Sequence, residues 1–210
     1  MRSASEVILS IEAGVLGGSV SIKTAGRLFS YSGGSDSSPK AELLLPKIDD
    51  LIQQAAASPK DINQIVVSAG PGSFTGIRIG IATALGFANA VGATLRRIPL
   101  LTAMASAAEG VVCASVPVGR GMLASQIFDV AADFIVELRP AFLHSSVDGL
   151  QASIGDIVIG QFVSLRGIHQ EPPMVKTVEI ANLAEQLAIA AGDLRIHESE
   201  PIFLSKPGNV

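Results

Sequence analysis

Apolar positions in the first half of the chain follow two spacings. Short apolar or alternating runs, which are typical of β-strands, occupy residues 6–12, 19–24, 27–31, 62–68 and 93–98. Apolar residues three and four positions apart, which are typical of helices, occupy residues 39–57, 75–91 and 99–108. Glycines separate the first three runs, so this half is predicted to open with a meander of three strands.

The second half repeats this order of elements. Strands are expected at residues 111–116, 120–128, 131–138, 156–160 and 202–204, and helices near 140–147 and 180–191. Three strands, a helix and a further strand therefore occur twice, with a boundary near residues 106–111. This order predicts two lobes, 1–108 and 109–210, of the duplicated α/β fold found in actin, Hsp70 and sugar kinases. An ordinary doubly wound sheet is the alternative.

The helix expected at residues 75–91 is apolar on nearly every side. Small residues recur at every fourth position, as Gly76, Gly80 and Ala84, and between Ile79 and Val91 only Thr83 and Asn89 are polar. A helix at a protein surface normally has a polar face. We therefore expect this helix to be covered on both sides, by its own sheet and by a second layer. A neighbouring helix of the same chain or another subunit would supply that layer.

The segment before this helix, residues 68–80, is rich in glycine. Its glycines permit backbone conformations that other residues avoid, and Ser73 or Thr75 is suited to cap the helix. The segment is not a P-loop, because Ile77-Arg78 follows Gly76 where that motif has Lys-Ser/Thr. Free N–H groups at a helix start bind anions, whereas the structural alternative is a tight strand-to-helix turn. The candidate residues for an anion or nucleotide are Glu12, Gly72, Ser73 and Thr75.

Composition narrows the function classes. The chain is 48% hydrophobic and 16% charged, with a net charge of −4 and a pI of about 5.3. The net negative charge argues against binding of nucleic acid by this chain alone. The low charge fits either an uncharged surface that contacts other proteins or a large core of small residues. The single Cys113, an N-terminus without an extended apolar region and the lack of about 18 uninterrupted apolar residues lead us to expect a cytoplasmic protein without a membrane span.

Complete catalytic constellations are not evident. His144, His169 and His197 are scattered and form no pair with zinc-binding spacing, and no Gly-x-Ser-x-Gly motif is present. A kinase needs acidic residues that hold magnesium, for which Glu12 and Asp148 are the candidates. We therefore predict no catalytic and no metal-binding residues.

The glycine-rich segment resembles that of the TsaB (YeaZ) family, which has a near-identical Gly-Pro-Gly-Ser-Phe-Thr-Gly sequence. Three other stretches are similar to that family: 8–12, where the family's first strand ends in Asp-Thr-Ser, 42–46, which matches its Leu-Leu-Pro, and 201–204, which matches its Pro-x-Tyr-Leu-Arg tail. The resemblance is strongest over residues 40–105.

This resemblance implies a two-lobed ASKHA (ribonuclease H-like) fold and a subunit that is not itself catalytic. Family members pair with a larger TsaD-type subunit, are joined by a TsaE-type ATPase, and serve in placing threonylcarbamoyl on the tRNA adenosine beside the anticodon. ATP and a metal ion are then expected on the partner subunits and no cofactor on this chain alone. Transfer RNA would be reached only through the complex, and a homodimer is a further expectation.

In the family, pairing uses the two helices of the first lobe. The contact residues expected here are Leu45, Ile48, Ile52, Ile79, Gly80, Thr83 and Asn89. The family's first-strand Asp is Glu12 in this chain, and its polar second-lobe segment is reduced to residues 118–123. These departures leave an alternative open, namely a divergent kinase-like enzyme of the same fold that binds a nucleotide or small molecule. A glycoprotease-like peptidase is a weaker alternative.

Overall fold

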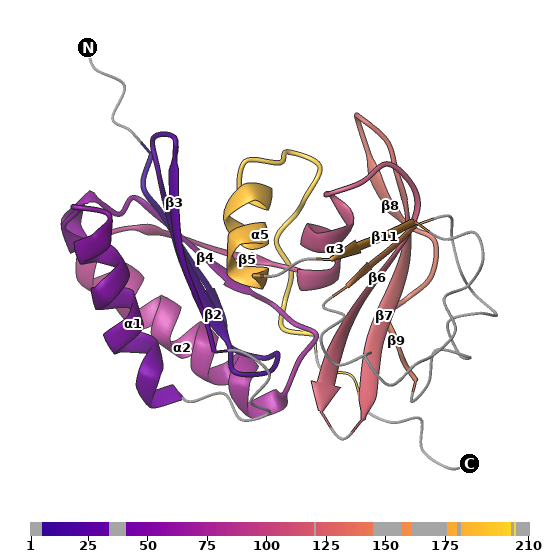
Figure 1. Cartoon of the computed structure of the whole chain (residues 1–210), viewed down its shortest axis with the longest axis horizontal. Coiled ribbons are helices and arrows are strands. Elements are labelled where there is room, and N and C mark those ends of the chain that lie inside the picture. Colours follow the sequence, from indigo (N-terminus) through magenta and orange to yellow (C-terminus); the bar gives the residue numbers. More distant parts are fainter. Residues whose placement is uncertain are drawn as a thin grey trace.

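The computed structural model describes residues 6–33, 41–119, 121–144, 157–160, 176–179, 182–202 and 204. Two sheets lie side by side with two helices between them (Figure 1). The strands of the first sheet are β1 (Ile8–Glu12), β2 (Ser19–Thr24), β3 (Arg27–Ser32), β4 (Gln64–Ser68) and β5 (Thr94–Ile98). They run in the order β3-β2-β1-β4-β5; β1, β2 and β3 pair antiparallel, whereas β4 pairs parallel with both β1 and β5.

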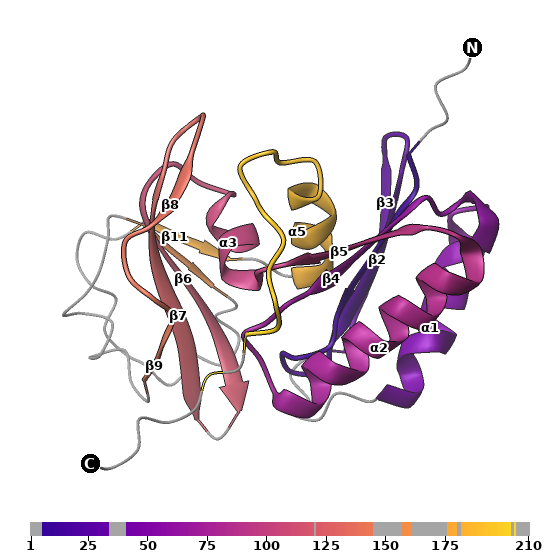
Figure 2. The same ribbon diagram turned by 180° about the vertical axis from the view of Figure 1, so that it is seen from behind.

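Helices α1 (Ala41–Gln54) and α2 (Phe74–Val91) cover the outer face of this sheet (Figures 1 and 2). A short 3-10 helix, η1 (Pro59–Asp61), follows α1. Side chains alternate along β1, so Leu9 and Ile11 join the core beneath α1 and α2, whereas Ile8 joins the core on the opposite face. The helices predicted over residues 39–57 and 75–91 are thus confirmed, and their apolar stripes are buried against this sheet.

The second sheet repeats the topology of the first. Its strands are β6 (Gly110–Gly119), β7 (Met122–Val130), β8 (Ile135–Glu137), β9 (Phe142–His144), β10 (Ile157–Gly160) and β11 (Lys176–Glu179). The order is β11-β10-β6-β7-β8, and β9 also pairs with β7. If β8 and β9 together take the place of the third strand, both sheets have the order 3-2-1-4-5. The predicted duplication is therefore present.

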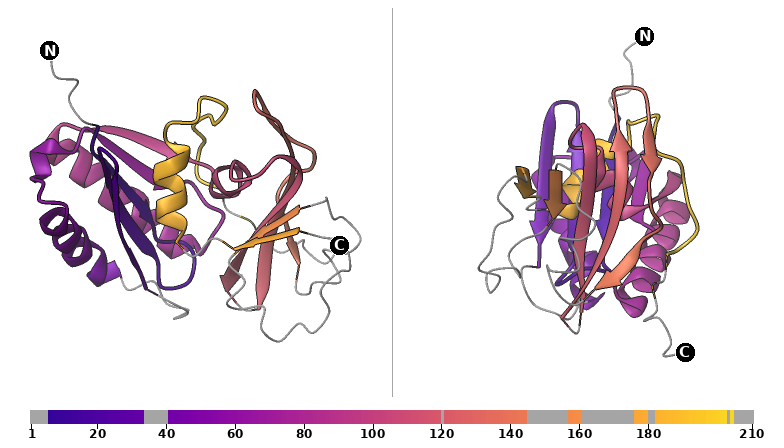
Figure 3. Two further views of the ribbon diagram at one scale, coloured as in Figure 1. Left: turned by 45° about the horizontal axis from the view of Figure 1, so that its top comes forward. Right: turned by 90° about the vertical axis from the view of Figure 1, so that its right-hand side faces the viewer.

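Two helices hold the sheets together. Helix α3 (Leu100–Ala105) follows the first sheet in sequence but packs on β6 and β7, whereas α5 (Leu183–Ala190) follows the second sheet and packs on β1 and β2. The two helices also contact each other, and both lie between the sheets in two opposite views (Figures 1 and 2). A single core cluster joins residues of both sheets, and a view from another side shows the same arrangement (Figure 3). The sheets divide near residues 108 and 109, but the lobes exchange helices, so the lobe boundary stays a prediction.

Two of the helices and strands expected from the sequence are not formed. The helix expected near residues 140–147 is a strand over Phe142–His144, because these residues pair with Leu123–Ser125 of β7; residues 145–147 lie outside the described part. The expected tail strand is not formed at Ile202 and Leu204, and Phe203 lies outside the described residues. In both segments tertiary contacts decide the conformation.

Candidate functional site

Helix α2 begins at a well-formed cap. Ser73 has an extended backbone, and its Oγ accepts a hydrogen bond of 3.0 Å from the Gly76 N–H. The helix ends at Gly92, which has a φ of +76°. The predicted role of Ser73 as a cap is confirmed.

One face of α2 lies on the sheet and the other is exposed. The buried residues are Gly76, Ile77, Gly80, Ala84 and Ala88. Exposed residues follow at helical spacing on the other side: Phe74, Thr75, Arg78, Ala82, Leu85, Gly86, Asn89 and Ala90. By length and composition alone α2 could cross a membrane, yet only 28% of it is buried within the chain. The apolar character of α2 is therefore explained only in part by its own core.

Helix α1 adds to this exposed surface. Its apolar stripe, with Leu44, Ile48, Leu51 and Ile52, is buried in the first lobe. Leu45 points away from the core and is 57% exposed, and Lys47 is paired with Asp50 at 2.9 Å. The helices lie side by side and contact each other (Figure 2). We call the exposed surface the docking face and define it as Leu45 of α1 with Phe74, Arg78, Ala82, Leu85, Gly86 and Asn89 of α2.

The predicted contact residues divide between this face and the core. Leu45 and Asn89 are exposed, and Ile79 and Thr83 are half-buried. Ile48 and Ile52 are fully buried in the chain's own core, so their predicted surface position is wrong.

Gly80 also points inward. A Cβ at this position would stand 3.2 Å from the Ala13 Cβ and 3.7 Å from the Val67 Cγ2. Apolar periodicity predicted the helix correctly. The contact residues, however, were assigned to its most apolar side, and this side faces the sheet, as is normal for a helix. The expectation that Gly80 lies on the contact surface is therefore wrong.

The predicted anion site at the start of α2 is closed by the chain itself. The Ser73 N–H donates to the Gly14 carbonyl at 2.6 Å, and the Gly76 N–H is taken by the Ser73 side chain. A Cβ on Gly72 would stand 2.7 Å from the Gly14 carbonyl oxygen, so the backbones are in close contact. Thr75 is exposed and lies one position inside the helix. The turn is therefore packed against the loop after β1, and it does not fit a bound phosphate.

Glu12 also fits a nucleotide or metal site poorly. Its side chain is 1% exposed, and its Oε1 accepts hydrogen bonds from the N–H groups of Gly14 at 2.6 Å and Val15 at 3.1 Å. Its Oε2 is buried without a hydrogen-bond partner in the described structure. Burial raises the pKa of Glu12 to about 8, although the two N–H groups lower it. In the ligand-free chain the side chain is therefore mainly neutral near pH 7, and its burial against its own loop leaves no open approach for a nucleotide or a metal ion.

The sequence is similar to proteins that form threonylcarbamoyladenosine on tRNA. The family model of TsaD, a tRNA N6-adenosine threonylcarbamoyltransferase, matches residues 37–127. The tRNA threonylcarbamoyladenosine biosynthesis protein TsaB of Escherichia coli is 44% identical over 64 residues, which cover 30% of this chain and 27% of that protein. TsaB of Haemophilus influenzae is 42% identical over 67 residues, 31% of this chain and 28% of that protein. The aligned part thus spans about a quarter of these relatives.

The fold agrees over nearly the whole chain. The crystal structure of YeaZ from Pseudomonas aeruginosa superposes with a TM-score of 0.67 at 18% identity and covers 95% of this chain and 100% of that chain. These matches support the resemblance to the TsaB (YeaZ) family. The predicted two-lobed ASKHA fold is confirmed.

One polar cluster was not predicted from the sequence. Ser125 Oγ lies 2.7 Å from His144 Nε2 and 2.8 Å from Ser115 Oγ. Pairing of β6, β7 and β9 brings these residues together, since Ser115 lies opposite Ser125 and His144 lies on the strand beyond. Ser125 is fully buried, so a substrate does not reach its hydroxyl.

Of the other candidate residues, His197 is the one that the structure describes. His197 is exposed, whereas His169 and Asp148 lie outside the described residues. Within the described part of the chain, no three His, Cys, Asp or Glu residues are close enough to hold a metal ion. Cys113 is buried, which raises the pKa of its thiol to about 12, as expected of a structural cysteine.

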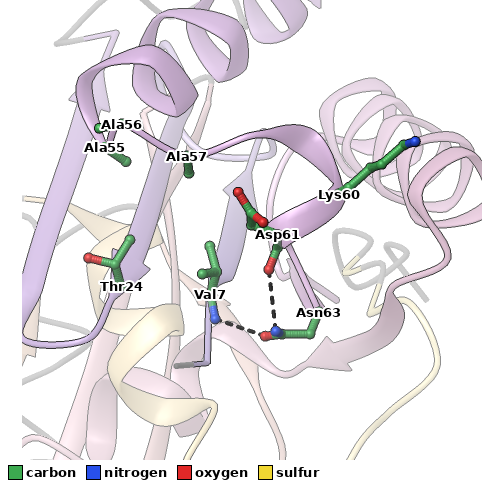
Figure 4. A pocket seen from close by; sticks show the side chains of 8 residues that line it. All are labelled: Val7, Thr24, Ala55, Ala56, Ala57, Lys60, Asp61 and Asn63. Atoms are coloured by element: carbon green, nitrogen blue, oxygen red, sulfur yellow. Dashed lines mark hydrogen bonds between the residues drawn. The ribbon is translucent and has the colours of Figure 1, made fainter. Parts of the chain in front are cut away.

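The cavity in Figure 4 lies at the edge of the first sheet where β1 and β4 begin. It has a volume of about 470 Å³ and is lined by Val7, Thr24, Ala55, Ala56, Ala57, Lys60, Asp61 and Asn63. Its hydrogen bonds are internal: the Val7 N–H donates to Asn63 Oδ1 at 2.8 Å, and Asn63 Nδ2 donates to the Asp61 carbonyl. The charged groups of Lys60 and Asp61 are solvated, and no buried polar group is directed into the cavity among those that the structure describes.

Proposed function

We propose that this chain is a non-catalytic subunit in the formation of threonylcarbamoyladenosine on tRNA, and that it acts by pairing with a TsaD-type subunit. The observation that carries the proposal is the docking face. Leu85 is 49% exposed and Phe74 is 57% exposed on a helix that has only Arg78 as a charged residue. Apolar residues at helical spacing on an exposed face are typical of a surface that another protein covers.

The shape of the docking face suits a second helix pair. Ala82 and Gly86 are exposed one turn apart, and a Cβ on Gly86 would meet no atom within 4 Å. Small side chains at this spacing let another helix approach closely, while Leu45, Phe74 and Leu85 supply the apolar anchors. The names of the TsaB relatives supply the process, tRNA threonylcarbamoyladenosine biosynthesis, and the TsaD family model covers both helices.

Pairing is tested by co-expressing the chain with the TsaD-type subunit of the same genome, followed by size-exclusion chromatography with light scattering. Leu85→Arg should abolish co-elution, with a loss of affinity of more than about tenfold, because a buried charge would replace a central apolar anchor. Ile189→Arg is the matched control, since Ile189 is a 56% exposed aliphatic residue on α5 and lies away from the docking face. Both variants should keep the thermal midpoint of the monomer.

The function is tested separately by measuring threonylcarbamoyladenosine in tRNA from cells whose own TsaB-family gene has been replaced by this chain. The unsubstituted chain and Ile189→Arg should maintain the modification, and Leu85→Arg should lose it. If the chain elutes apart from the TsaD-type subunit and leaves the modification absent, the proposed function is wrong.

A further inference from the structure

The tail after α5 returns to the first lobe. Its residues 196–202 run beside β5 and end at the turn before α2 (Figure 2). The Ser199 N–H donates to the Arg97 carbonyl at 3.2 Å, and the Ile202 N–H donates to the Ala69 carbonyl at 2.7 Å. Two of the stretches that resemble the family, the glycine-rich segment and the C-terminal tail, are therefore in contact although about 130 positions separate them in sequence.

The contact at the glycine-rich turn is close. Gly70 has a φ of +94°, and a Cβ there would stand 2.7 Å from the Ile202 carbonyl oxygen and 2.8 Å from the Ile77 Cδ1. Ile77 belongs to the first turn of α2. The tail, the turn and the beginning of α2 thus meet at one backbone position, which only glycine occupies without strain.

A second contact holds the turn from the other side. The Ser73 N–H donates to the Gly14 carbonyl, and Gly72 lies against the backbone of Gly14. This contact is formed by the loop after β1, most of whose residues are buried. The tail contact is more exposed: Arg97 holds Glu200 through two hydrogen bonds of 3.0 and 3.2 Å, and the Glu200 side chain is 82% exposed. Exposed contacts open at a lower free energy than buried ones, so the tail is the contact that can loosen.

We propose that residues 196–202 form a strap that positions the start of α2, and with it the docking face, for the partner subunit. The inference rests on the proposed function, because it assigns the strap to the pairing surface. The strap acts through Gly70 and Ile77, so its loss changes the direction of α2 and leaves the core beneath the helix in place. Phe74 and Arg78, the docking-face residues nearest to this turn, are the ones displaced first.

The test compares two glycines with positive φ. Gly70→Ala introduces a methyl group against both the strap and Ile77, whereas Gly92→Ala carries the cost of positive φ alone, because a Cβ at Gly92 meets no atom within 4 Å. Affinity for the TsaD-type subunit is measured at a temperature where both variants are fully folded. We expect Gly70→Ala to lose about tenfold in affinity and Gly92→Ala less than about twofold. Equal losses in the two variants would overturn the proposal.

Amide hydrogen exchange of the isolated chain separates this inference from the proposed function. In Gly70→Ala, exchange should increase at the first turn of α2 and over residues 196–202, while the second half of α2 keeps its protection. A uniform increase along the whole helix would mean general destabilisation and would overturn the strap. This readout needs no partner, so it remains informative if the TsaD-type subunit does not bind.

A charge exchange tests the strap from its other end. Glu200→Arg should place two cations together, increase exchange at residues 199–202 and weaken partner binding a few-fold. Adding Arg97→Glu restores an opposite pair and should recover both properties, as expected of a contact rather than of a residue needed for folding. No recovery in the double variant would contradict the role of this pair.

Discussion

Helices α2 and α5 have similar sequences in one respect: both are apolar on nearly every side. In α5, six of eight residues are buried, because one side lies on β1 and β2 and the other contacts α3. In α2, five of eighteen residues are buried, because among the described elements the sheet covers one side and α1 lies alongside. The comparison shows that an all-round apolar helix requires two covering layers. The described part of the chain supplies both layers to α5, whereas one side of α2 stays exposed.

The surfaces on which α2 and α5 pack differ in polarity as well. Helix α5 is fixed by polar contacts: the Ala184 N–H donates to Ser19 Oγ at 3.1 Å, and Ser21 Oγ donates to the Ala184 carbonyl at 2.9 Å. Gln186 Nε2 donates to the Ala103 carbonyl of α3 at 2.7 Å. The inner face of α2 is almost entirely apolar and small. Helix α5, together with α3, is therefore fixed between the lobes, whereas α2 keeps an exposed face.

The largest effect should come from truncating the helix that is covered twice. Leu187→Ala in α5 removes a side chain that is completely buried in the shared core, so the free energy of unfolding should fall by about 3 kcal/mol. Leu85→Ala in α2 should cost the monomer less than about 1 kcal/mol, because Leu85 is half-exposed. Urea denaturation of both variants gives the two values. Similar losses would mean that α2 is covered within the chain as α5 is.

The buried carboxyl group at the end of β1 should respond to pH. The pKa of Glu12 is about 8 in the folded chain, against 4.5 for a glutamate free in water, so the fold favours the neutral form. Its contribution to stability is complete below pH 4.5 and is lost as the pH rises through 8. Between about pH 5.5 and about pH 7.5 the wild type should lose about 2 kcal/mol relative to Glu12→Gln, which does not titrate. Parallel stability curves for the two proteins would show that Glu12 is solvated.

The two helix caps sharpen the comparison further. Asn182 accepts from the Ala184 and Glu185 N–H groups and donates to the Tyr31 carbonyl, so its side chain joins α5 to β3. Ser73 caps only its own helix. Asn182→Ala should therefore cost about 2 kcal/mol and Ser73→Ala about 1 kcal/mol in chemical denaturation. Equal costs would remove the bridging role assigned to Asn182.

The smallest effect concerns the open side of α2. Gly86→Ala should stabilise the monomer by about 0.5–1 kcal/mol, because alanine favours the helix and no atom opposes the added methyl group. The same methyl group should weaken pairing if another helix approaches closely at this point. Thermal unfolding and a partner titration measure these two opposed changes. A gain in both would place Gly86 outside the contact.

Much of the fold was predictable because periodicity reports the faces of elements. The meander at residues 6–32 and the helix at 75–91 follow from spacing alone, and the cap at Ser73 follows from its chemistry. The strand at Phe142–His144 was predicted as a helix, because a run of three residues carries too little periodicity and its pairing with β7 decides it. The phase of the two docking helices was also missed. Ile48, Ile52 and Gly80 lie on the inner side, because the more apolar side of each helix packs on the chain's own sheet.

By itself the sequence determined that this chain has two lobes of repeated order and a capped apolar helix after a glycine-rich turn. These features depend on local spacing and on residue chemistry, which a chain carries without its fold. Only the tertiary structure decided that α3 and α5 exchange lobes, that Glu12 is buried against its own turn, and that the tail reaches Ala69. Each of these joins residues distant in sequence or depends on exclusion of water, and no local pattern encodes either.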